Sequence, residues 1–234
     1  YRREKALTDF VHLHTHTEYS LLDGASRIGD LIKKAKEQGM KSLAITDHGA
    51  MYGVVDFYKE AVANGIKPII GCEVYVAPRT RFDKTHEYDS KYSHLILLAE
   101  NQTGYKNLIK IVSAGFTEGF YYKPRVDFEL LEKYSEGLIV LSACLAGEIP
   151  KAILNGSYDE AKAIAEKYIK VFGKDNYFIE IQDHGLADQK RSNPELIRLA
   201  RELGLGIVAT NDIHYVNKED AEAQDCGRPG ENEV

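Results

Sequence analysis

Three histidines stand at alternate positions near the start of the chain: His12, His14 and His16, in the stretch FVHLHTHTEYSLLDG. In an extended segment, residues two apart point to the same side, so the imidazoles of His14 and His16 can reach one region. The pair Asp212-x-His214 repeats this spacing much later in the chain. Imidazole nitrogens and carboxylate oxygens are ligands that Zn²⁺, Mn²⁺ and Fe²⁺ accept. Both pairs therefore indicate a metal site.

Further ligand-type residues stand beside other predicted strands. They are Asp23 after the first strand, His48 after the second, Glu73 within the third, His94 at the front of the fourth and Cys144 at the end of the fifth. A lone cysteine is more often a small buried side chain than a ligand. A carboxylate inside an apolar run needs a partner, because burying an unpaired charge is costly. The gathering of ligand types at several strand ends favours a metal site over isolated structural roles.

Short apolar runs alternate with amphipathic segments along the chain, which predicts a parallel α/β fold. The predicted strands are Phe10–Leu13, Ser42–Thr46, Ile69–Val76, Leu95–Ala99, Leu138–Ser142, Tyr177–Ile181 and Ile207–Thr210. The predicted helices cover residues 27–38, 54–64, 105–116, 157–173 and 193–204. Periodicity does not separate a closed barrel from an open sheet. Polar clusters after several different strands favour the barrel, because one rim of a barrel collects such residues.

Composition narrows the class of protein. The 234 residues suit one large domain or two small ones. The net charge of -6 excludes a global attraction to nucleic acid, so a nucleic-acid site would need a local basic patch or bound cations. Cys72, Cys144 and Cys226 lie far apart and form no CxxC pair, which favours a reduced, cytoplasmic setting. No apolar run reaches the length that a membrane span needs.

Six stretches together resemble one known family. HLHTHTEYSLLDGA, ITDHGAMYG, GCEVYV, SHLILLAEN, LSACLAGE and TNDIHY look like motifs of the polymerase and histidinol phosphatase (PHP) domain. EGFYYKPRVD and EIQDHGL are more similar to the branch found in the alpha subunit of bacterial DNA polymerase III, in the type without an inserted exonuclease. On this resemblance, residues 1–225 form a single PHP domain. Residues 226–234 are a tail that does not look like the continuation of the family.

The resemblance implies a distorted seven-stranded (β/α) barrel that holds three divalent metal ions, Zn, Mn or Fe. Carried over position by position, the metal-binding and catalytic residues are His14, His16, Asp23, His48, Glu73, His94, Cys144, Asp212 and His214. This intact set is similar to the members that remove nucleotides from a DNA 3′ end in proofreading. The implied partners are a primer 3′ end, the remainder of a polymerase chain, which would hold the polymerase site, and other replisome subunits.

Two alternatives to an exonuclease stay open at this point. Bound metal can supply folding free energy by itself, so the domain could be a non-catalytic scaffold that binds another replisome subunit. A stand-alone phosphatase of the histidinol phosphate type is the other alternative. The replicase-like motifs YYKPRVD and LSACLAGE argue against it.

Three residues are predicted to support the ligands: His12 through a core position or a hydrogen bond to a ligand, and Asp47 and Asn211 by orienting the ligands next to them. His12 shares the parity of His14 and His16 but lies deeper in the predicted strand. Asp47 and Asn211 stand directly beside ligands in the sequence.

The stretch YYKPRVD supplies candidate substrate-binding residues. Lys123 and Arg125 are predicted to grip a backbone phosphate, for which a guanidinium is well suited. Tyr121 and Tyr122 are candidates for stacking on a terminal base, and packing within a loop is an equally good interpretation of their rings.

Overall fold

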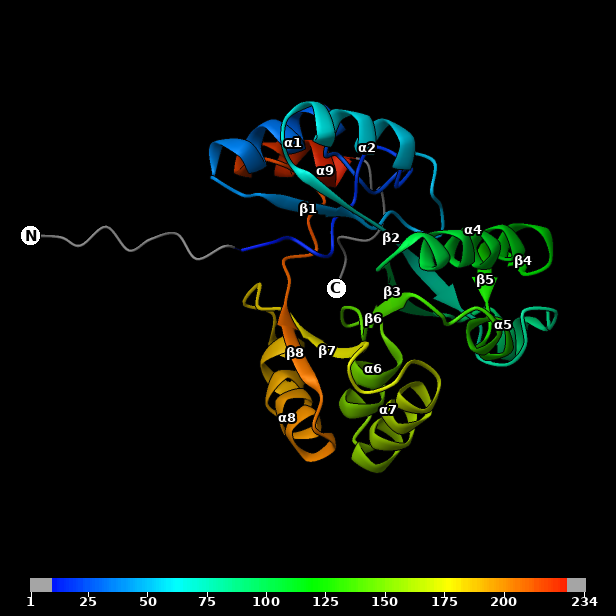
Figure 1. Cartoon of the computed structure of the whole chain (residues 1–234). Helices are drawn as coiled ribbons and strands as arrows, with labels where there is room; N and C mark the ends of the chain where they lie inside the picture. Colours follow the sequence, from blue (N-terminus) through cyan, green and yellow to red (C-terminus); the bar gives the residue numbers. More distant parts are fainter. Residues whose placement is uncertain (1–9, 227–234) are drawn as a thin grey trace, which may run out of the picture.

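The computed structural model describes residues 10–226. Helices and strands alternate through most of this range, as Figure 1 shows. In chain order the elements are α1 (Ile28–Glu37), β1 (Ser42–Ile45), α2 (Val54–Ala63), β2 (Lys67–Val76), α3 (His86–Asp89), β3 (Ser93–Ala99), α4 (Gln102–Thr117), β4 (Phe120–Tyr121), β5 (Lys123–Val126), α5 (Phe128–Lys133), β6 (Leu138–Leu141), α6 (Glu148–Leu154), α7 (Tyr158–Phe172), β7 (Tyr177–Ile181), α8 (Ala187–Leu203), β8 (Gly206–Ala209), the 3-10 helix η1 (Lys218–Asp220) and α9 (Ala221–Cys226). Among these described residues, no helix combines the length and the apolar character that crossing a membrane requires.

An eight-stranded sheet forms the centre of the fold, in the order β4-β5-β2-β3-β6-β7-β8, with β1 paired to β2 outside this path. The pairs β1–β2, β2–β5, β6–β7 and β7–β8 are parallel. Strand β3 runs antiparallel to both of its neighbours, β2 and β6. The first residues of β3 therefore lie at the edge of the sheet where the neighbouring strands end.

The prediction that every strand runs parallel is thus wrong at β3. Parallel neighbours need a crossover connection that passes over the sheet, usually through a helix of some length. The connection from β2 to β3 holds only the short helix α3, and the chain returns in the opposite direction. Hydrophobic runs predict where strands lie, but they contain no information about strand direction.

The predicted strand Phe10–Leu13 is not a regular strand in the structure. The segment 12–16 nevertheless takes a strand's place, because backbone hydrogen bonds of 2.7–3.2 Å join it to Ala44 and Thr46 on one side and to Ile213 on the other. These bonds connect β1 to the chain that follows β8. Segment 12–16 thereby completes the distorted seven-membered barrel together with β1, β2, β3, β6, β7 and β8, which confirms the predicted architecture.

Two further differences concern element limits. The short strands β4 and β5 form a hairpin where the sequence predicted none. Helix α8 begins at Ala187 rather than near residue 193, so Pro194 lies inside the helix. Gln189 and Ser192 are buried by this additional stretch, and the tertiary packing outweighs the local preference of proline for a first turn.

Helices cover the outside of the barrel, and α4 packs over β2, β3 and β5. Helices α1 and α2 pack over β1, with α9 beside them although it ends the described chain, whereas α6, α7 and α8 lie together at the opposite end in Figure 1. Helix α1 shows why it packs there: Ile28, Leu31, Ile32 and Ala35 recur at helical spacing and are all buried. A smaller apolar cluster is formed by residues of the strands or just after them: Ala44, Ile96, Leu98, Leu141 and Ala143.

Candidate metal centre

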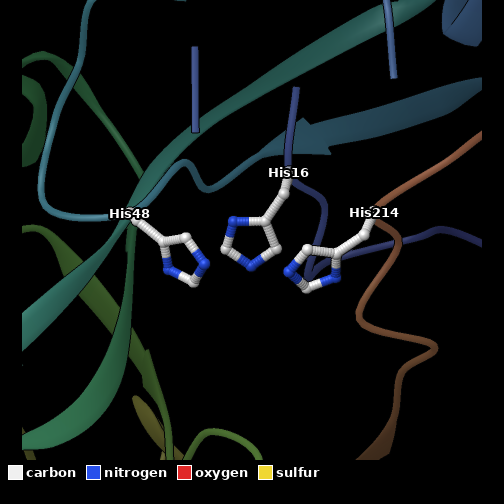
Figure 2. Close-up of side chains that lie close together, drawn as sticks. All are labelled: His16, His48 and His214. Atoms are coloured by element: carbon white, nitrogen blue, oxygen red, sulfur yellow. The ribbon is translucent and has the colours of Figure 1, made fainter. Parts of the chain in front are cut away.

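The predicted ligands converge on one cavity of about 420 Å³. Its lining includes Asp23, His48, Glu73, His94, Cys144, Asp212 and His214. His14 and His16 are fully buried and contact these lining residues from below the surface. Figure 2 shows His16 between His48 and His214, with ring centroids 4.0 and 4.3 Å away.

Glu73 is the carboxylate at the middle of the cluster. Its oxygens lie 2.5 Å from His48 Nδ1, 2.9 Å from His94 Nδ1 and 3.3 Å from His14 Nε2. Cys144 Sγ is 4.0 Å from Glu73 Oε1. The side chain is fully buried, so its charge must be balanced by these neighbours or by a cation.

Two other carboxylates extend the cluster on either side. Asp212 Oδ1 lies 3.1 Å from His14 Nε2 and 3.2 Å from His16 Nε2. Asp23 Oδ2 lies 2.6 Å from His48 Nε2 and 3.3 Å from His214 Nε2. Every predicted ligand therefore has at least one other predicted ligand within about 4 Å.

The backbone explains how residues so far apart in sequence meet. His48 follows β1 and bridges to Glu73 in β2, and His94 at the start of β3 bridges to Gly147. Because β3 is antiparallel, its front reaches the same rim as the ends of the parallel strands. This accounts for His94 standing before its apolar run instead of after it. Asp212 has a φ of 48°, a left-handed conformation that few non-glycine residues adopt and that aspartate adopts more readily than most.

The side chains present fit divalent ions. Nine buried side-chain atoms among the described residues make no hydrogen bond of ordinary geometry, and four of them belong to predicted ligands: His48 Nδ1, Glu73 Oε2, Asp212 Oδ1 and His214 Nε2. The close neighbours of these four atoms are atoms of other predicted ligands. Buried polar atoms are normally paired, so unpaired lone pairs that converge on one place fit ions between them. Three overlapping groups offer ligand atoms within 4.8 Å of one another: His16, His48 and His214; His14, His16 and Glu73; and His48, Glu73 and His94.

Charge states in the buried cluster suit metal binding. Burial and the neighbouring His48 lower the pKa of His16 to about 3, so its imidazole is neutral and has a lone pair to donate. Burial alone would raise the pKa of Glu73, but His94, His14 and His48 hold it well below its ordinary value. Glu73 is therefore an anion at neutral pH.

Two other ligands must give up protons when an ion binds. Burial, and secondly Glu73, raise the pKa of the Cys144 thiol well above its ordinary value. For His14, burial lowers the pKa, but the charges of Asp212 and Glu180 outweigh it and raise the pKa well above 6.5. An ion favours the thiolate and the neutral imidazole, so metal binding is expected to release protons.

Glu180 in β7 is a residue of the centre that the sequence analysis did not identify. It is buried, its Oε1 lies 2.7 Å from His14 Nδ1, and it also accepts a hydrogen bond from Thr210. A carboxylate on the far nitrogen of a ligating imidazole fixes the ring and its tautomer. The sequence does contain a sign of this role, because Glu180 is a carboxylate within the apolar run YFIEI, just as Glu73 is a carboxylate within an apolar run.

Asp47 holds the loop that follows His16. It accepts hydrogen bonds from the Thr17 backbone N–H (2.6 Å) and from Ser20 Oγ (2.7 Å), and Ser20 Oγ lies 3.0 Å from His16 Nδ1. Asp47 therefore contacts His16 through Ser20, and its orienting role stays a prediction.

The structure does not bring His12 and Asn211 to the ligands. The His12 ring packs against Phe10, with centroids 4.9 Å apart, and with Asn211 it lines a separate cavity of about 250 Å³. The hydrogen bond recorded for Asn211 uses its backbone carbonyl, which accepts from His184. His12 shares the parity of His14, but it lies too deep for its side chain to reach the metal centre.

The residues predicted to bind substrate separate into two groups. Lys123 lines the cavity of the metal centre. Arg125 is fully buried and donates to the carbonyls of Asp89, Arg81, Asp83 and Gly119, so its guanidinium is not available to phosphate. Tyr121 and Tyr122 pack on each other, with centroids 4.6 Å apart, and neither lines this cavity in the described part of the chain.

Comparison with known proteins decides the family. The sequence profile of the PHP domain matches residues 12–184. This chain belongs to the PHP domain family. The PHP domain described here is 55% identical over 221 residues to the DNA polymerase III subunit alpha of Treponema pallidum, covering 94% of this chain and 19% of that protein. It is 52% identical over 220 residues to the Thermus aquaticus protein of the same name, and the match covers 92% of this chain and 18% of that protein. The chain thus spans about a fifth of the length of these relatives.

Solved structures of low sequence identity share the fold. An amidohydrolase from Chromobacterium violaceum with bound sulfate and no metal has a TM-score of 0.58 at 14% identity, over 96% of this chain and 99% of that one. A second structure is a two-domain protein from Bacteroides vulgatus that contains a predicted PHP-like metal-dependent phosphoesterase. Its TM-score is 0.53 at 16% identity, over 91% of this chain and 55% of that one. At these identities the likeness concerns the PHP fold alone.

Removing divalent ions from the PHP domain is expected to lower its unfolding temperature by about 5–15 °C. Ions bound to the folded state alone stabilise it, and without them the buried charges of Glu73 and Asp212 lose cations that balance them. Scanning calorimetry with and without EDTA measures the shift, and adding back Mn²⁺ or Zn²⁺ should restore it. EDTA already saturated with metal is the control. An unchanged transition in protein shown to have lost its ions would contradict a stabilising role.

Proposed function

We propose that this PHP domain is a metal-dependent phosphodiesterase that removes nucleotides from the 3′ end of DNA and so proofreads for a replicative polymerase. The observation that carries the proposal is the convergence of His14, His16, Asp23, His48, Glu73, His94, Cys144, Asp212 and His214 at one open cavity. The relatives named as DNA polymerase III subunit alpha make DNA the preferred substrate.

The same nine residues are proposed to hold three divalent ions. Such ions would act as Lewis acids and would lower the pKa of a water molecule, so that hydroxide is available to attack phosphorus at neutral pH. Glu180 keeps the ring of His14 oriented, and the Asp47–Ser20 contacts do the same for His16. Lys123, on the wall of the cavity, is placed to contact a backbone phosphate. Cys144 acts as a ligand in this proposal and not as a nucleophile, because burial keeps its thiol protonated until an ion displaces the proton.

The second candidate is a scaffold whose ions serve stability alone. Full burial of His14, His16 and Glu73 favours it, because ligands enclosed in this way gain folding free energy from the ion whether or not substrate binds. The open cavity above these residues, with Lys123 on its wall, favours the nuclease. A phosphatase of small monoesters is less well supported, since the relatives at 52–55% identity are polymerase subunits.

A primer-shortening assay tests the proposal. With Mn²⁺ or Zn²⁺, the protein is expected to shorten a 5′-labelled single-stranded or 3′-recessed primer from its 3′ end, one nucleotide at a time. EDTA, a 3′-terminal phosphorothioate linkage, or His14→Ala should each suppress the ladder of products. If primers stay intact while bound metal is verified in the same sample, the exonuclease is ruled out and the scaffold is retained.

A further inference from the structure

Three exposed aromatic rings form a line on the surface. Tyr52, Phe116 and Phe120 are 56%, 36% and 50% exposed. The ring centroids of Tyr52 and Phe116 are 6.0 Å apart, and those of Phe116 and Phe120 are 6.4 Å apart. Each ring is therefore within the usual contact range of the next.

These rings come from separate segments and are not part of the hydrophobic core. Tyr52 precedes α2, Phe116 lies near the end of α4 and Phe120 begins β4. None of the three is a buried member of the core clusters found among the described residues. Large apolar side chains that gather at the surface without serving the core commonly mark a binding surface.

The aromatic line begins at the metal centre. Tyr52 and Phe116 line the same cavity as Glu73 and His94, and Phe120 continues the line away from it. A phosphodiester held at the metal ligands would therefore have its neighbouring nucleotides beside these rings. Among the described residues that line the cavity, Lys123 is the one lysine, and none is an arginine.

We propose that Tyr52, Phe116 and Phe120 form a stacking surface for the unpaired bases next to the scissile phosphodiester, so that the site takes single-stranded DNA. This inference rests on the proposed nuclease function. Apart from the ions proposed at the ligands, the chain offers phosphates little electrostatic attraction, because its net charge is -6 and the cavity is lined by one lysine. Stacking on aromatic rings supplies affinity without sequence preference, because every base has a π face.

Binding measurements with and without bases test the stacking surface. The probes are fluorescein-labelled oligothymidylate and an abasic strand of equal length, both with phosphorothioate linkages, and the readout is fluorescence anisotropy with the metal-loaded protein. Wild type is expected to bind oligothymidylate at least about tenfold more tightly than the abasic strand. The double variant Tyr52→Ala/Phe116→Ala should lose about tenfold in affinity for oligothymidylate and bind the abasic strand unchanged.

Two controls separate stacking from general damage. Tyr52→Phe/Phe116→Tyr keeps both rings and should retain the affinity. Tyr88→Ala removes a ring that is 57% exposed but does not line the cavity, and it should change nothing. If wild type binds both strands equally, or if the double alanine variant binds oligothymidylate as wild type does, the stacking proposal is overturned and the rings are left as a protein contact surface.

Hydrolysis of bis(p-nitrophenyl) phosphate, a small diester without a nucleobase, keeps this test distinct from that of the proposed function. If wild type hydrolyses this diester but binds the two strands equally, the phosphodiesterase proposal is kept and the stacking proposal is rejected. If wild type binds oligothymidylate more tightly than the abasic strand but hydrolyses no diester, the stacking proposal is kept and the nuclease proposal is rejected.

Discussion

Glu73→Gln is expected to lower metal-dependent hydrolysis of a phosphodiester by at least about 10³-fold. Glutamine has nearly the same size and shape as glutamate, so packing at this fully buried position is preserved while one negative charge is removed. The carboxylate contacts His48, His94 and His14, and it belongs to two of the three groups that could hold an ion. Removing its charge therefore weakens several ligand positions together.

Two measurements check this prediction: the number of metal ions per chain, by plasma mass spectrometry after dialysis, and the rate of diester hydrolysis. Both are expected to fall in Glu73→Gln. The matched control is Glu129→Gln, because the Glu129 side chain is 76% exposed and lies outside the cavity. A Glu73→Gln protein with wild-type metal content and wild-type rate would show that Glu73 is not a ligand.

The sequence predicted which side chains would meet at one cavity, because its signals are local. His14 and His16 share one side of an extended segment, and a carboxylate such as Glu73 in an apolar run requires partners wherever the strand is placed. Hydrophobic runs located most strands within one or two residues, as β7 illustrates at Tyr177–Ile181. These inferences need no knowledge of how distant segments meet.

Predictions that depended on distant segments were less successful. The position of His94 became intelligible only when the structure showed β3 to be antiparallel, which no periodicity reveals. His12 stands at the same alternating positions as His14 and His16, but its ring packs against Phe10 and lines a different cavity. Which cavity a side chain reaches is set by the packing of the whole barrel. Glu180 carried the same signal as Glu73, a carboxylate within an apolar run, and was missed.

Arg125 shows this limit most clearly, and its replacement is the second prediction with a large effect. Arg125→Met is expected to lower the free energy of unfolding by about 3 kcal/mol. The guanidinium donates four hydrogen bonds, of 2.8–3.3 Å, to backbone carbonyls of Arg81, Asp83, Asp89 and Gly119. Methionine fills much of the same volume but removes all four hydrogen bonds, and of these carbonyls that of Gly119 still accepts from the backbone N–H of residue 125. The sequence alone could not show that residues 81–89 fold over β5 to receive this side chain.

Lys123→Met is the matched control, two residues away on the same strand. Its side chain is exposed at the cavity, so this change should leave stability within about 0.5 kcal/mol of wild type and weaken substrate binding instead. Urea unfolding measures the first quantity, and KM for a diester measures the second. If Arg125→Met unfolds like wild type but raises KM, Arg125 contacts phosphate after all and the buried hydrogen bonds contribute little. We expect the opposite result, in which Arg125 contributes to stability and Lys123 to substrate affinity. The Arg125 guanidinium is fully buried and four of its five N–H groups donate to backbone carbonyls, so it does not reach a phosphate in the cavity.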